Sequence, residues 1–381
     1  MDLLRPRDLR SLVEAPAGPS VSIFMPSHRA GPEVRQDPIR LKNMLGLAEE
    51  RLLEDGLRRP DAREILDPAQ ALLEDEEFWQ HQGDGLALFL SKDHGRVFRL
   101  PLALDELLVT GDRYQIKPLI PLLSGDARFL ILAVSQKEIR LLQATRQVIQ
   151  EVELEEVPDS LREVAVHREM RFLNYHTGSG FSGGGRRAAV FHGHGDQTDE
   201  ELIRKYLRAI DQGIRSAIGD ERSPLVLAGV RFLLDAYRSV SEYPTILPDV
   251  VQGNPDELSN EELHAQARPI VEARFRQRIE EATGRFEEQL GTGLAVGGVD
   301  EVVPAAAHGR VEVLWVALGV QRWGVLDEET ASVEVRDQPR QGDEDLLDRA
   351  AADALLSGGT IYAVKPGAVP GDAPIAALLR Y

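Results

Sequence analysis

The 381-residue chain contains no cysteine, and none of its apolar runs approaches the roughly 18 residues that a membrane helix needs. Without cysteine the chain forms no disulfides, offers no thiolate metal ligands and has no cysteine nucleophile. Residues Met1 to Arg10 alternate charge with leucine and lack the apolar stretch of a signal peptide. We therefore expect a cytoplasmic protein with no membrane partner.

Two common catalytic motifs are also missing. The chain has no Gly-x-x-x-x-Gly-Lys-Ser/Thr phosphate loop and no His-Glu-x-x-His zinc motif. These absences exclude the most familiar nucleotide and zinc sites, and we expect no cofactor.

Positive charge is scarce. The 44 lysines and arginines face 63 acidic residues, which gives a net charge of −19. A uniformly acidic surface repels phosphate, so broad binding to polyanions such as DNA is not expected. The deepest acidity lies in residues 276–381, which suits a protein partner better than RNA.

One window has the opposite character. Between Val164 and Gly195 there are four arginines, one acidic residue (Glu169) and four of the nine histidines. Five glycines between Thr177 and Gly185 make this window adaptable in backbone conformation. The arginines in it are Arg168, Arg171, Arg186 and Arg187. Any contact with RNA is expected here.

The apolar pattern predicts an α/β protein. The chain is too long for a single core, and we predict domains at 1–125, 126–275 and 276–381. In the first, residues 20–25 predict a strand, residues 41–52 a helix, and residues 86–90 with 97–100 a hairpin. In the last, helices at 300–308 and 344–356 with strands at 311–317 and 360–364 predict a compact α/β/α module.

The central segment alternates strands with helices. Residues 128–134 and 224–229 are apolar runs typical of buried strands, and residues 260–290 predict a long charged helix. Thr198 to Glu201 has the form of a capping box, which predicts a helix behind it. Its apolar face comprises Leu202, Ile203, Tyr206, Leu207, Ile210, Ile214 and Ile218.

Two constellations in the basic window could carry chemistry. His192, His194 and Asp196 have the ligand types of a metal-dependent hydrolase, although such a site needs further ligands from elsewhere. Gly193, Gly195 and Gln197 instead suit contact with RNA. Glycines allow a close backbone approach, and a helix start favours phosphate. An ordinary surface loop with a helix cap explains the same residues without chemistry.

Several stretches resemble the bacterial relatives of the archaeo-eukaryotic peptide release factors and Pelota. They are Phe-Leu-Ile-Leu-Ala-Val-Ser-Gln-Lys-Glu-Ile-Arg-Leu-Leu (129–142), Pro-Leu-Val-Leu-Ala-Gly-Val (224–230) and Gly-Asn-Pro-Asp-Glu-Leu-Ser (253–259). The N-terminal runs Met-Pro-Ser-His-Arg-Ala-Gly-Pro-Glu (25–33) and Asp-Pro-Ile-Arg-Leu-Lys-Asn (37–43) are similar to the same family, as is Ala-Ala-Ala-His-Gly-Arg-Val-Glu (305–312).

The resemblance implies a three-domain protein. Its central domain would be RNase H-like, and its C-terminal module would resemble kink-turn-binding ribosomal proteins. In true release factors a loop of the central domain carries Gly-Gly-Gln, whose glutamine helps place water against peptidyl-tRNA. Here the matching residues are Gly195, Asp196 and Gln197. The added Cβ and negative charge of Asp196 weaken close packing against RNA. The Asn-Ile-Lys-Ser element used near stop codons is absent.

The sequence thus predicts a factor that enters the tRNA-binding A site of the ribosome and meets rRNA there. It would act in rescue, hibernation or another stress response, without reading stop codons. The predicted RNA contacts are Arg168, Arg171, Arg186, Arg187, His192, Gly193, His194 and Gly195. The alternatives are hydrolysis of peptidyl-tRNA by Gln197, a metal-dependent hydrolase using His192, His194 and Asp196, and a binding role in which the acidic C-terminal module meets a translational GTPase or another protein.

Overall fold

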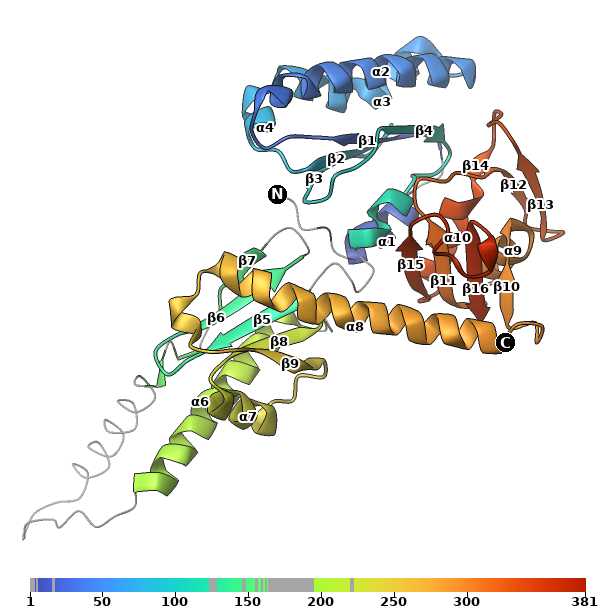
Figure 1. The fold of residues 1–381 in the computed structure, drawn as a ribbon. Helices are drawn as coiled ribbons and strands as arrows, with labels where there is room; N and C mark the ends of the chain where they lie inside the picture. The colour runs from blue at the N-terminus through green and yellow to red at the C-terminus, as the bar shows by residue number, and fades with distance from the viewer. Residues whose placement is uncertain are drawn as a thin grey trace, which may run out of the picture. The chain divides into compact units, whose positions relative to one another are not determined.

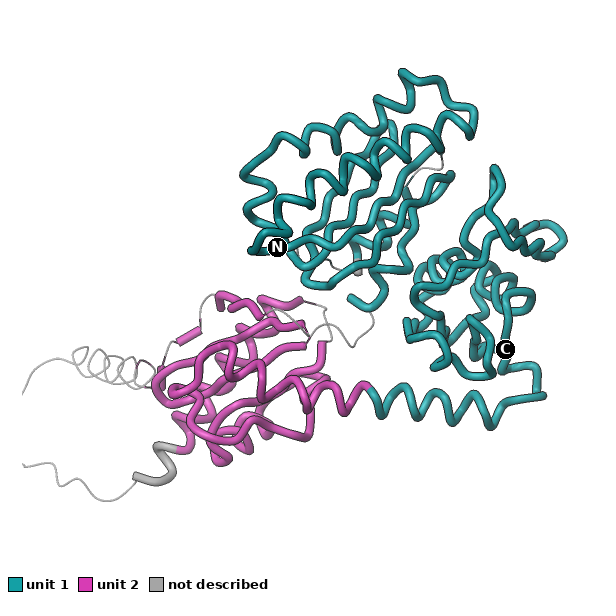
Figure 2. The backbone as a smooth tube through the Cα atoms, turned by 45° about the horizontal axis from the view of Figure 1, so that its top comes forward, with its two compact units in different colours: residues 1–124, 276–381 teal, residues 125–275 magenta. Residues whose placement is uncertain are grey.

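The computed structural model divides the chain into two compact units. Unit 1 comprises residues 1–124 and 276–381, and unit 2 comprises residues 125–275 (Figure 2). The mixture of helices and sheets confirms the predicted α/β class. The separation of 1–125 from 276–381 as independent domains stays a prediction. The structure describes residues 4, 6–15, 18–122, 129–145, 149–154, 157–158, 160–161, 163, 195–219 and 223–381, of which 6 and 195–199 are described by their backbone alone. In these ranges no helix is long and apolar enough to cross a membrane.

The N-terminal part of unit 1 is an antiparallel sheet in the order β3-β2-β1-β4, covered by helices (Figure 1). Alternate residues of β1 face opposite sides: Val21, Ile23 and Met25 pack on α2 and α3, whereas Phe24 packs in a cluster with α1. The predicted strand, helix and hairpin are all present. The bounds are α1 Pro6–Val13, β1 Ser20–Pro26, α2 Asp37–Glu54, α3 Arg59–Ala71, α4 Glu76–Gln80, β2 Gly85–Ser91, β3 Gly95–Leu100 and β4 Leu107–Gly111.

The C-terminal part of unit 1 has a four-stranded sheet in the order β10-β16-β11-β15. Helices α9 and α10 pack on one face, and Ala282 and Phe286 of α8 pack on the other beside Trp315. A second sheet, β13-β12-β14, was not predicted from the sequence; its strands are short, and β14 comprises only Glu344 and Asp345. The bounds are β10 Ala295–Gly297, α9 Val299–Ala307, β11 Val311–Ala317, β12 Trp323–Asp327, β13 Ser332–Arg336, β14 Glu344–Asp345, α10 Leu346–Leu356, β15 Thr360–Val364 and β16 Ile375–Leu379.

A buried charge cluster joins these two parts of unit 1. The Lys117 ammonium, with a side chain 1% exposed, donates to an Asp345 carboxylate oxygen at 2.5 Å and to the Val320 carbonyl at 2.5 Å. Asp348 accepts the backbone N–H groups of Ile116 at 2.7 Å and Lys117 at 2.5 Å. Because Asp345 also caps α10 through the Leu347 N–H, the residues around Lys117 are tied to the start of that helix.

Unit 2 is a mixed sheet in the order β7-β6-β5-β8-β9, with β5, β8 and β9 parallel. All six residues of β5 are buried. Leu130, Leu132 and Val134 share a core with α6 and α7, whereas the alternate residues pack on α8. The RNase H-like fold of this unit stays a prediction at that level of detail. The bounds are β5 Phe129–Val134, β6 Ile139–Ala144, β7 Ile149–Val152, α6 Gly195–Ile218, β8 Leu225–Gly229, α7 Arg231–Val240, β9 Ile246–Gln252 and α8 Asn260–Glu288.

Candidate functional site

Most of the predicted RNA-contact window lies outside the described residues. This holds for Arg168, Arg171, Arg186, Arg187, His192, Gly193 and His194. Gly195, Asp196 and Gln197 are described by their backbone, which forms the first turn of α6. The helix therefore begins three residues before the predicted capping box at Thr198. Acidic residues in the first turns of a helix stabilise its positive end, and Asp196, Asp199 and Glu200 supply them here.

Helix α6 extends well past the strands that it covers (Figure 1). Its buried face, from Ile203 to Ile214, packs on the sheet as predicted. Among the described side chains of α6, Ile203 is the first that is buried, and further along the helix the Tyr206 hydroxyl donates to the carbonyl of Ser135 at 3.3 Å. At 1.5 Å per residue, Gln197 lies about 9 Å along the helix from Ile203 and about 14 Å from Tyr206. Gln197 therefore lies at the N-terminal end of α6, before the part of the helix that packs on the sheet.

A buried carboxylate holds the rest of α6 in place. Asp211, 2% exposed, accepts hydrogen bonds from the Tyr237 hydroxyl at 3.1 Å, from the Ser241 hydroxyl and from the Glu242 N–H at 3.2 Å. Arg215 pairs with the same carboxylate at 3.2 Å. Burial raises the pKa of Tyr237 above its ordinary value, so its hydroxyl remains a donor. Sequence reasoning missed Asp211, although an acidic residue between Ile210 and Ile214 on an apolar face was the signal.

The start of α6 is acidic. Asp196, Asp199, Glu200 and Glu201 lie within its first two turns. The first cation along the helix, Arg204, pairs with Glu200 at 3.1 Å. Negative charges around Gln197 oppose the approach of an RNA end, so positive charge for RNA contact has to come from other segments.

The carboxyl ends of the parallel strands are where α/β sheets usually bind ligands. Strands β5 and β8 end in Ala133-Val134 and Ala228-Gly229, which carry no ligating side chains. A Cβ on Gly229 would lie 2.7 Å from the Val134 carbonyl oxygen, so the strands meet too closely there for a larger residue. Within the described ranges no group of three or more His, Cys, Asp or Glu side chains could hold a metal ion. The proposed ligands His192 and His194 lie outside those ranges, so the metal site with Asp196 stays a prediction.

The N-terminal family-like run forms an ordered polar cluster. Asp37, fully buried, accepts the backbone N–H of His28 at 2.9 Å, its Nδ1–H at 3.0 Å and an Arg40 N–H at 2.9 Å. Arg29 makes a two-bond fork to Asp84 at 2.8 and 2.7 Å. These contacts fix the connection from β1 to α2. The resemblance of this run could be recognised from its residues, whereas its pairing could not.

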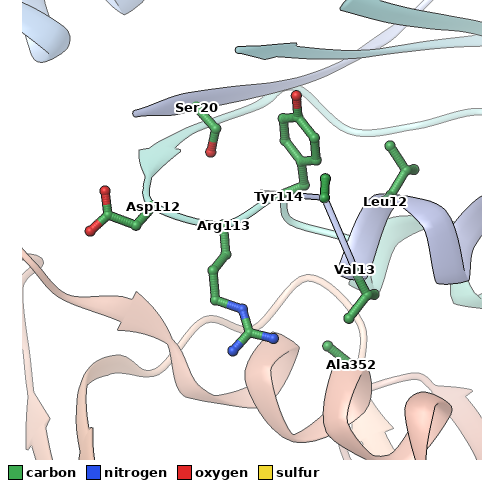
Figure 3. Close-up of a pocket in the computed structure, with 8 residues that line it drawn as sticks. Leu12, Val13, Ser20, Asp112, Arg113, Tyr114 and Ala352 are labelled. Carbon is green, nitrogen blue, oxygen red and sulfur yellow. The ribbon is translucent and has the colours of Figure 1, made fainter. Parts of the chain in front are cut away.

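Unit 1 has a small cleft beside the end of α1 (Figure 3). It measures about 200 Å³ and is lined by apolar Leu12, Val13 and Ala352 together with Asp112 and Arg113. Figure 3 shows Arg113 reaching toward the helix that carries Ala352, and its guanidinium lies 3.7 Å from Asp353. Pockets for drug-sized ligands span about 300–1,000 Å³, so this cleft is too small for a nucleotide-sized cofactor.

Comparison with known proteins relates residues 128–310 to a known family. The family described as bacterial archaeo-eukaryotic release factor family 3 matches residues 128–310. This match confirms the predicted relation to bacterial relatives of the release factor and Pelota proteins, over a segment that includes α6 and its start at Gly195. No curated protein matches the chain.

Several solved structures are similar at low identity. The archaeal translation termination factor aRF1 is 16% identical, with 99% of each chain covered and a TM-score of 0.25. Pelota of Archaeoglobus fulgidus is 13% identical, with 100% of this chain and 94% of that chain covered and a TM-score of 0.28. Dom34 of S. cerevisiae, described as a termination-like factor that interacts with Hbs1, is 13% identical, with 73% of each chain covered and a TM-score of 0.37. Because these TM-scores are low, the relation to the release factor family is assigned from the family match alone.

Proposed function

Since residues 128–310 are related to bacterial archaeo-eukaryotic release factors, we propose that the chain is a ribosome-associated factor that enters the tRNA-binding A site. It acts there in ribosome rescue, hibernation or another stress response, and it does not read stop codons. The family match is the observation that carries this proposal. Helix α6 supports it, because a long helix anchored at Tyr206 and Asp211 is suited to carry the preceding loop away from the body of unit 2.

The RNA contacts of this factor are the basic residues before α6. Arg168, Arg171, Arg186 and Arg187 neutralise phosphates, and His192, Gly193, His194 and Gly195 allow a close approach. The acidic C-terminal part of unit 1 meets a protein partner, such as a translational GTPase. With a net charge of −19, the chain contacts RNA through this small area and does not coat it.

Co-sedimentation with ribosomes tests the proposal. The full chain should pellet with vacant or stalled ribosomes at low salt, and the double variant Arg186→Gln/Arg187→Gln should pellet at least tenfold less. The matched control is Arg58→Gln/Arg59→Gln, another pair of adjacent arginines, whose side chains are 82% and 64% exposed. This control should bind as the unchanged chain does. Absence of binding at low salt rejects the function, and equal losses in both variants reject the assigned RNA contacts.

Peptidyl-tRNA hydrolysis by Gln197 is the enzymatic alternative. The carboxylates of Asp196, Asp199, Glu200 and Glu201 in the first turns of α6 count against it, because they repel the phosphates of a tRNA end. We expect the chain to release no peptide from stalled complexes, and Gln197→Ala to bind ribosomes as the unchanged chain does. Release that disappears in Gln197→Ala would establish the hydrolase. A stoichiometric metal in the purified protein would instead point to His192, His194 and Asp196.

A further inference from the structure

The outer edge of strand β13 (Ser332–Arg336) pairs with no other described strand. In the sheet order β13-β12-β14 this strand is terminal, and β14 pairs only with Trp323 and Gly324 of β12. The N–H and C=O groups along such an edge are free to pair with an added strand. Ser332, Glu334 and Val335 are exposed, and Val335 is 43% accessible. The edge thus offers main-chain hydrogen bonds together with an apolar contact.

The surroundings of this edge are strongly acidic. From Asp327 to Arg340 there are five acidic residues and two arginines, Arg336 and Arg340. Arg336 is paired with Glu334 at 2.8 Å and with Asp343. Hydrogen bonds from Thr330 and Glu329 lower the pKa of Asp327, which favours its charged form. An open groove of about 540 Å³, lined by the residues from Glu334 to Arg340, continues from the strand.

We propose that β13 and this groove bind an extended basic segment of a partner protein, which adds to the sheet as a fourth strand. Main-chain pairing would supply affinity, as in other cases of strand addition, and lysine or arginine side chains would meet Glu334 and Asp337. Alternate apolar side chains of the partner would cover Val335. This inference rests on the protein partner proposed above for the acidic C-terminal part of unit 1, and its test does not depend on ribosome binding.

The charge pattern argues against a second copy of the chain as occupant. An antiparallel pair of two β13 strands centred on the strand would place Glu334 opposite Glu334. Like charges directly opposite each other destabilise a strand pair. In that register the carboxylates disfavour self-pairing, and they favour a cationic strand.

A peptide-binding assay with the full chain tests the proposal. The probe is a fluorescent octapeptide of alternating valine and lysine, followed by anisotropy at low ionic strength. Two peptide controls are a valine–glutamate octapeptide and the valine–lysine octapeptide with alternate backbone nitrogens methylated. Methylation removes the donors for strand pairing and leaves the charge unchanged. We expect the first probe to bind and both controls to bind at least tenfold more weakly.

Matched variants locate the binding surface. Glu334→Lys/Asp337→Lys should weaken the valine–lysine probe at least tenfold. Glu50→Lys/Glu280→Lys changes the net charge equally at exposed residues of α2 and α8 and should weaken it less than twofold. Three outcomes would overturn the proposal: no binding of the probe, equal binding of the methylated peptide, or equal losses in the two variants. The methylated peptide decides the question even if the Glu334 variant folds poorly.

Discussion

Asp345 in unit 1 and Asp211 in unit 2 are both buried carboxylates, but different donors hold them. In unit 1, Asp345 receives the ammonium of Lys117, which is 228 positions away and also buried. In unit 2, Asp211 receives two hydroxyls, a backbone N–H and the guanidinium of Arg215, whose side chain is 46% exposed. Unit 1 therefore contains a complete buried ion pair, whereas the charge of Asp211 is compensated by a cation that stays in water.

The difference has consequences for how each unit tolerates change. A buried ion pair gains little net stability when intact, since both ions are desolvated, but removal of one partner leaves an uncompensated charge. Removal of the Asp211 carboxylate, whose cation stays in water, costs hydrogen bonds, and the remaining donors can partly rehydrate. The unit 1 cluster should therefore be the more fragile of the two.

Replacement of Lys117 should have the largest effect. Lys117→Met should destabilise unit 1 by about 3–5 kcal/mol, because Asp345 and Asp348 remain buried without a cation. The measurement is urea unfolding followed by tryptophan fluorescence, since Trp79, Trp315 and Trp323 all belong to unit 1. Lys92→Met, at a lysine whose side chain is 64% exposed, is the control and should change stability by less than about 0.5 kcal/mol. Adding Asp345→Asn to Lys117→Met should recover part of the loss, and additive losses would contradict a coupled pair.

Removal of the Asp211 carboxylate should have a smaller effect, confined to unit 2. Asp211→Ala should cost about 2 kcal/mol, because the buried hydroxyl of Tyr237 loses its acceptor. Far-ultraviolet circular dichroism should report this loss, while the tryptophan transition of unit 1 stays in place. Asp235→Ala, at a side chain 68% exposed, is the matched control. A shift of the tryptophan transition in Asp211→Ala would show that the two units do not unfold independently.

The local elements were predictable from the sequence because their signals are local. The buried face of α6 and both faces of β5 follow from the spacing of apolar residues. The hairpin of β12 and β13 was missed although Ser332 to Arg336 alternates polar residues with valine, which is the period of a strand with one partly covered face.

The polar clusters could not be predicted in the same way. Lys117 stands before a proline in a short segment without periodicity, and its partner lies 228 positions along the chain. Asp345 has the form of an ordinary helix cap, which is a role that it also fills. The candidate site is a similar case. The sequence identified Gly195 to Gln197 through a resemblance, but the start of α6 at Gly195 and its anchors at Tyr206 and Asp211 follow only from the fold.

The dependence of stability on pH tests whether the buried carboxylates of the two units differ in electrostatic strain. Burial, and then the neighbouring Asp345 carboxylate, raise the pKa of Asp348 to about 7. The folded chain therefore holds this proton more tightly than the unfolded chain, in which an aspartate has a pKa of about 3.9. The stability that protonated Asp348 contributes is greatest at low pH and is lost as the pH rises through about 7.

Between pH 5 and pH 8, the unchanged chain should therefore lose stability relative to Asp348→Asn, by about 2–3 kcal/mol. The amide oxygen of asparagine can still accept the N–H groups of Ile116 and Lys117, so the contacts survive while the titration disappears. Urea unfolding of both proteins across this range, followed by tryptophan fluorescence, measures the difference. Asp211 has a permanently charged arginine beside it, and Asp211→Asn should leave the pH profile of unit 1 unchanged. Parallel profiles for the unchanged chain and Asp348→Asn would mean that Lys117 already compensates the buried carboxylates in full, and that the two units differ in donor type but not in electrostatic strain.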